Sequence, residues 1–169
     1  MNTKQSIKFS INEGSSYEFY KRFDEFKGRR FVINSAFQGN LSYTANRANM
    51  VLLRSKMRVF GFEVLRVLGN YSELDMDIEC NVGFVPKDMD DQEAIRFLFY
   101  YGKWFNQNGF FYVDTDDIVW IYSTRQDSTF GGYGRKIRTK KFLKKDFPEL
   151  VTKFCNLTYV YNGVKIVTD

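Results

Sequence analysis

The sequence predicts an α+β fold, in which two helices cover one face of an antiparallel sheet. Three observations support this prediction: runs of β-branched and aromatic residues of strand length, two stretches with apolar residues at helical spacing, and the order in which they alternate. Along the chain that order is β-α-β-β-α-β. It is the split βαβ arrangement of a ferredoxin-like sandwich.

The first strand and the first helix are predicted between residues 30 and 61. The run "RFVINSA" (30–36) has the β-branched and aromatic composition of a strand. Residues 44–60 then carry an apolar stripe at 3-4-3 spacing, formed by Met50, Leu53, Met57 and Phe60. Gly61 is expected to cap this helix at its C-terminus. Three arginines are expected on other faces of the helix: Arg47, Arg54 and Arg58.

Two strands, a second helix and two further strands complete the predicted core. "FEVLRVL" (62–68) and "IECNVGFV" (78–85) are the second and third strands, and Pro86 ends the latter. Asp90 followed by Glu93 is a capping box that opens the second helix. "FFYV" (110–113) and residues 118–122 are the last two strands.

The chain is expected to divide into three parts. Residues 1–29 form an N-terminal extension, residues 30–122 the ferredoxin-like core, and residues 123–169 a C-terminal extension that packs on the core. In this last part a Gly-rich basic loop and a short helix are followed by Asn162-Gly163, a dipeptide typical of a type I′ β-hairpin. Because both helices cover one face of the sheet, the other face is expected to bury against something else, and an uncovered aromatic face invites a ligand or a second subunit.

The composition excludes several classes of chemistry. The 169 residues include no histidine, so Ser-His-Asp catalysis, Cys-His catalysis and His-ligated zinc are all excluded. The two cysteines are far apart and are expected to be reduced, so we predict no metal and no separate cofactor. No apolar run approaches a membrane span or a signal-peptide core, and a soluble cytoplasmic protein is expected.

The most suggestive polar residues lie at strand ends. Tyr71 ends one strand just after Gly69, which permits close backbone approach, and Glu79 lies near the start of the next. No basic residue occurs within five positions of Glu79. An exposed acid and a packed tyrosine are the ordinary alternatives. A second candidate site lies where the first strand ends. There a pocket could be lined by Ser35, Ala36, Phe37, Gln38 and Asn40.

Several of these residues form a pattern in the order "VINSAFQGNL", "NRANMVLLRSKM", "VLGNY" and a strand that begins near Glu79. The pattern resembles the bacteriophage S-adenosylmethionine (SAM) hydrolases, better described as SAM lyases, which remove the host's SAM and so serve anti-restriction. The resemblance covers roughly residues 30–122. The loop between Tyr71 and Glu79 is shorter than the family pattern, so Glu73 is a rival for the key acid.

The resemblance implies a reaction, a site and an assembly. Intramolecular attack of the SAM carboxylate would give 5′-methylthioadenosine and homoserine lactone, although open homoserine would fit the same residues. Glu79 would hold the α-ammonium group, Tyr71 would orient the same end, and the backbone of residues 35–37 would hold adenine. Asn40, Gly69 and a glutamine that maps to Gln107, or to Asn106, would complete the site. The family also implies a homotrimer with sites between subunits, with SAM as the only small-molecule partner.

Two other functions fit the same sequence. A ferredoxin-like module could bind SAM or a nucleotide without cleaving it. It could also bind nucleic acid through the basic run "RKIRTKKFLKK" (135–145), although such a run is more often a solvated face. The segment "GFFYV" does not match the aromatic consensus of an RNA-recognition sheet, so nucleic acid is not expected as a partner.

Overall fold

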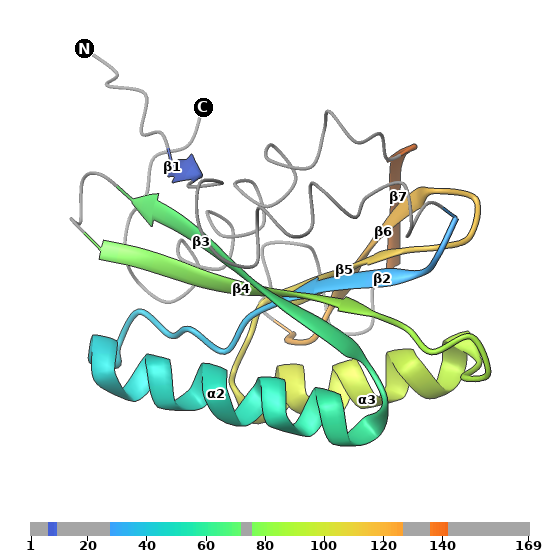
Figure 1. The fold of residues 1–169 in the computed structure, drawn as a ribbon. Coiled ribbons are helices and arrows are strands. Elements are labelled where there is room, and N and C mark those ends of the chain that lie inside the picture. The colour runs from blue at the N-terminus through green and yellow to red at the C-terminus, as the bar shows by residue number, and fades with distance from the viewer. Residues whose placement is uncertain (1–6, 10–27, 72–75, 127–135, 142–169) are drawn as a thin grey trace, which may run out of the picture.

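A computed structural model describes residues 7–9, 28–71, 76–126 and 136–141 (Figure 1). Several features expected from the sequence lie outside these residues, among them most of the N-terminal extension, Glu73, the Gly-rich part of the basic loop, the short C-terminal helix and the Asn162-Gly163 hairpin.

Seven described strands form one sheet in the order β1-β3-β4-β2-β5-β6-β7, and every neighbouring pair is antiparallel. The strands are β1 (Ile7–Phe9), β2 (Phe31–Asn34), β3 (Glu63–Tyr71), β4 (Met76–Phe84), β5 (Gly109–Val113), β6 (Ile118–Ser123) and β7 (Lys136–Lys141). The helices α2 (Tyr43–Phe60) and α3 (Asp91–Trp104) lie side by side on one face of this sheet (Figure 1).

The predicted α+β class, with an antiparallel sheet and two helices, is confirmed. Along the chain, the core elements follow one another as β2, α2, β3, β4, α3 and β5, which is the order β-α-β-β-α-β. In the sheet, the four strands are neighbours in the order β3-β4-β2-β5, which is compatible with a ferredoxin-like arrangement. The sheet has two edge strands that the sequence did not predict. Residues 7–9 add β1 to the edge of β3, and residues 136–141, expected within a basic loop, form β7 beside β6.

α2 ends and α3 begins at the residues that the sequence indicates. Ser42 accepts a hydrogen bond from the backbone of Ala45 at the start of α2, and Asp90 accepts one from Glu93 at the start of α3. Gly61 follows α2 with a φ of 114°, a left-handed conformation that favours glycine. These local signals set where α2 and α3 begin and where α2 ends.

The central strands are buried on both faces. All residues of β2 and β5 are buried, including Phe31 and Ile33, which alternate with Val32 and Asn34 along β2. The face of these two strands that the helices leave uncovered is therefore buried as well, and the expected ligand or second subunit stays a prediction. No helix in the described part of the chain is long and apolar enough to cross a membrane.

Candidate functional site: a buried glutamate among three arginines

Glu79 lies on β4, on the face of the sheet that α2 covers, and its side chain is 0% exposed. Acidic side chains are rarely buried this completely unless they are paired. The backbone register explains how it can be paired, because Arg66 of β3 is opposite Asn81, two residues along β4 from Glu79. Residues two apart on a strand share a face, so Arg66 and Glu79 lie on the same side of the sheet.

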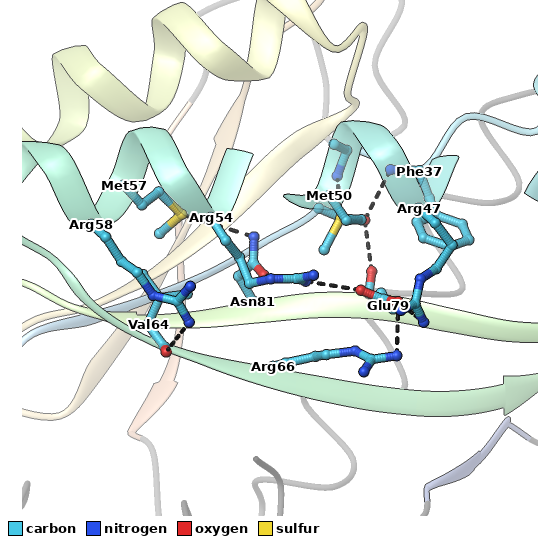
Figure 2. A network of polar contacts seen from close by, with 12 residues as sticks. Phe37, Arg47, Met50, Arg54, Met57, Arg58, Val64, Arg66, Glu79 and Asn81 are labelled. Carbon is cyan, nitrogen blue, oxygen red and sulfur yellow. Dashed lines mark hydrogen bonds and ion pairs between the residues drawn. The ribbon is translucent and has the colours of Figure 1, made fainter. Parts of the chain in front are cut away.

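Three arginines hold the two carboxylate oxygens (Figure 2). The Nη1 of Arg47 is 2.5 Å from Oε1, and the Nη2 of Arg66 is 3.0 Å from the same oxygen. The Nη1 of Arg54 is 2.8 Å from Oε2. Arg47 and Arg54 are seven residues apart on α2, which returns them to the same face of the helix after two turns. Helix and strand thus aim three guanidinium groups at one acid.

The arginines differ in how much water they meet. The side chain of Arg54 is 9% exposed and also lies 3.4 Å from Oδ1 of Asn81, so it belongs to the interior. The side chains of Arg47 and Arg66 are 35% and 33% exposed. The site therefore has a buried end at Arg54 and an accessible end at the other two arginines.

The exit of β2 is joined directly to Glu79. The hydroxyl of Ser35 donates to the backbone carbonyl of Glu79 at 2.8 Å and accepts a hydrogen bond from the backbone N–H of Phe37 at 3.1 Å. The backbone N–H of Ala36 lies 3.1 Å from the sulfur of Met50 on α2. These contacts fix the strand exit between α2 and β4.

Two buried side-chain amides form hydrogen bonds to the backbone of residues 37–38, just after β2. Asn46, 0% exposed, accepts from the backbone N–H of Gln38 at 2.7 Å and donates to its carbonyl at 2.9 Å. Gln107 donates through Nε2 to the carbonyl of Phe37 at 2.8 Å, while its buried Oε1 has no hydrogen-bond partner. The segment is thus held from both α2 and the turn after α3.

The structure brings some of the predicted site residues together and leaves others apart. Ser35, Ala36, Phe37, Glu79 and Gln107 are all buried around the exit of β2, and Asn40 lies in an exposed turn. In the β3–β4 ladder Gly69 is opposite Ile78 and Tyr71 is opposite Met76, three pairs beyond the pair formed by Leu68 and Glu79. The prediction for the Tyr71 side chain remains a prediction.

Sequence reasoning missed the arginines. It placed Arg54 away from the core, but the residue is buried. A signal was present: Arg54 is four residues after Met50 and three before Met57, so it borders the apolar stripe of α2. The contribution of Arg66 depends on strand register, which the sequence does not state.

The expectation of reduced cysteines is also wrong for Cys80, which is disulfide-bonded; Cys155 lies outside the described residues.

Comparisons with protein families, with curated proteins and with solved structures find no match to this chain. Within the described ranges, no group of three or more acidic, cysteine or histidine side chains could hold a metal ion. The described side chains of the site offer guanidinium groups, one carboxylate, amides and a hydroxyl.

Proposed function

We propose that the protein is a SAM lyase, which cleaves SAM to 5′-methylthioadenosine and homoserine lactone. One observation carries this proposal: residues that are scattered over the sequence pattern of that family lie together in the fold. Ser35 is hydrogen-bonded to the backbone of Glu79, and Arg47 is paired with its side chain. Gln107 is bonded to Phe37, which follows the same strand exit.

The proposed reaction needs no group that the chain lacks. An oxygen of the SAM carboxylate attacks Cγ, and the Cγ–S bond breaks with its electron pair going to the sulfonium sulfur. The products are a neutral thioether and a lactone, and no proton has to move. The protein's task is to fold the substrate so that the reacting atoms are about 3–3.5 Å apart.

The charged cluster suits the zwitterionic end of such a substrate. In the proposal Glu79 pairs with the α-ammonium group, and Arg47 turns from Glu79 toward the substrate carboxylate. Arg47 is suited to this exchange because its side chain is 35% exposed, whereas Arg54 stays behind as a buried partner of Glu79. Tyr71 orients the same end, the segment 35–37 lines the adenine, and three subunits assemble with sites between them. The ferredoxin-like class of the fold belongs to the same proposal.

A binding protein without catalysis is the second candidate, and a specific observation favours it. Both carboxylate oxygens of Glu79 are already held by guanidinium groups, and the side chain has no exposed surface. If this arrangement persists with ligand bound, Glu79 is a structural counter-ion. Such a protein would capture SAM or a related nucleotide and return it unchanged.

Incubation of the purified full chain with SAM, followed by chromatography and mass spectrometry, separates the two candidates. Methylthioadenosine together with homoserine lactone is expected. Homoserine from the outset, without lactone, would indicate water as the nucleophile. Intact SAM with measurable binding would favour the second candidate, and intact SAM without binding would overturn both.

Glu79→Gln tests the assigned residue, because it keeps the side-chain shape and removes the charge. We expect turnover to be lost while circular dichroism and subunit assembly are retained. Glu93→Gln is the matched control, since Glu93 is exposed on α3. A fully active Glu79→Gln variant would reject the role of Glu79 and direct attention to Glu73.

A further inference from the structure

The charges around Glu79 do not balance. Arg47, Arg54 and Arg66 contribute three positive charges, and among the acids whose side chains the structure describes only Glu79 pairs with them. The excess is therefore two positive charges, both on side chains that are partly withdrawn from water. A buried carboxylate can be compensated by one well-placed arginine, and each additional buried guanidinium has a desolvation cost. Compensation of Glu79 alone therefore does not explain the cluster.

The two accessible arginines are held close to each other. Arg47 comes from α2 and Arg66 from β3, yet both contact the same oxygen, Oε1 of Glu79 (Figure 2). Like charges at this separation repel each other, and the repulsion is larger where water is partly excluded. A second anion between the two guanidinium groups would relieve it.

Hydrogen-bond donors remain for such an anion. Each guanidinium group has five N–H donors in a planar fork. Arg66 uses Nη2 for Glu79, and its buried Nε has no hydrogen-bond partner. Arg47 contacts Glu79 through Nη1. Forked donors of this kind match the oxygens of a carboxylate or a phosphate.

We infer that Arg47 and Arg66 form a binding site for one oxyanion group of a small molecule, a carboxylate or a phosphate. Glu79 is the buried counter-ion that holds the two guanidinium groups in place before the ligand arrives, which lowers the ordering cost of binding. The inference goes beyond the proposed function, because the site binds its anion whether or not SAM is cleaved. If both hold, the anion is the α-carboxylate of SAM.

Isothermal titration calorimetry with inorganic phosphate and with acetate tests the site on the full chain at low ionic strength. The wild type is compared with Arg47→Gln and Arg66→Gln, and Arg96→Gln is the matched control because Arg96 is exposed on α3. Loss of a charge-assisted contact should weaken binding about tenfold in each site variant and leave the control unchanged. Tighter binding of acetate would indicate a carboxylate ligand, and tighter binding of phosphate a phosphorylated one.

Two results would overturn the inference: no binding of either anion, or binding that both site variants retain in full. Circular dichroism of each variant guards against unfolding, and Arg47→Lys is a milder change that keeps the charge and loses the fork. We expect Arg47→Lys to bind more weakly than the wild type and more tightly than Arg47→Gln.

Glu79→Gln separates this inference from the proposed function. The variant raises the excess to three positive charges but also releases the two guanidinium groups from their counter-ion, so phosphate binding should persist even though SAM turnover is lost. Phosphate binding in a wild-type protein that leaves SAM intact would reject the lyase and keep the anion site. Cleavage of SAM by a wild-type protein that binds neither probe would reject the anion site alone.

Discussion

Arg54 and Glu79 are 25 residues apart in the sequence and are joined by a 2.8 Å ion pair in which both side chains are buried. The pair connects the middle of α2 to β4, so it links the helical layer to the sheet. Arg54 also contacts Asn81 on the same strand. The candidate site thus extends from the protein core, at Arg54 and Glu79, to the partly exposed side chains of Arg47 and Arg66.

Replacing Arg54 by methionine should lower the free energy of unfolding by about 2–4 kcal/mol. The change leaves Oε2 of Glu79 without its partner in a region with little water, while the other two arginines still hold Oε1. Urea denaturation followed by circular dichroism measures the loss.

The double variant Arg54→Met/Glu79→Gln provides the control for this interpretation. When residue 79 carries no charge, removing Arg54 no longer leaves a buried carboxylate oxygen without its partner. The double variant should therefore lose less than the sum of the two single variants. Strict additivity would show that the ion pair contributes nothing of its own.

Much of the fold was predictable because its signals are local. The apolar stripe of α2, the cap at Gly61 and the Asp90–Glu93 box each act within one or two helical turns. The α+β class required only the order in which strands and helices alternate along the chain. The edge strands were not predicted, because β1 and β7 are defined by pairing with distant segments rather than by their own composition.

The site was predictable only in part, for the same reason. Glu79 was singled out because its strand carries no nearby base, but its partners come from α2 and from β3. An arginine on a helix is ordinarily read as solvated, and only packing shows that Arg54 is buried. Glu79 could be identified as a candidate from its neighbours in the sequence, whereas the residues that contact its side chain are set by the tertiary fold.

Gly83 is a position where the sheet and α2 approach closely. A Cβ added there would lie 2.5 Å from Cε of Met57 and 3.1 Å from Cγ1 of Val32. Gly83→Ala should therefore destabilise the protein by about 1–3 kcal/mol through overpacking. Thermal or urea unfolding measures the change.

The clash with Met57 gives this prediction its control. Met57→Ala alone should cost about 2–5 kcal/mol because it leaves a cavity. In the double variant the new methyl group occupies part of that cavity, so the combined loss should be smaller than the sum. Equal stability of Gly83→Ala and the wild type would mean that Met57 moves aside without cost.

Asn46 should matter for both stability and ligand binding. Asn46→Ala removes two hydrogen bonds to the backbone of Gln38 and leaves its partly buried N–H and carbonyl without these partners. We expect a loss of about 2 kcal/mol in unfolding free energy, together with weaker SAM binding because the segment after β2 is released. Asn46→Asp keeps the acceptor and loses the donor, so it should be intermediate in binding; unchanged SAM affinity in Asn46→Ala would detach this segment from the site.

Tyr112 predicts a stability change at alkaline pH. Its hydroxyl donates to Oδ1 of Asp91 at 2.5 Å, and Arg30 contacts the same oxygen at 2.8 Å. Burial, followed by the hydrogen bond and the charge of Asp91, raises the pKa of Tyr112 above its ordinary value. The folded protein therefore keeps this phenol protonated at a pH where the unfolded chain ionises it.

The sign of the effect follows from that difference. The stabilisation is complete below about pH 10, the pKa of an unfolded tyrosine, and declines as the pH rises toward the higher folded pKa, by up to about 1.4 kcal/mol per pH unit. Tyr112→Phe removes the group, so the stability advantage of the wild type over this variant should shrink between about pH 8 and about pH 11. Urea unfolding of both proteins at the two pH values measures it, and the other tyrosines and the lysines cancel in the comparison. An advantage that stays constant over this range would show that Tyr112 ionises equally in the folded and unfolded states.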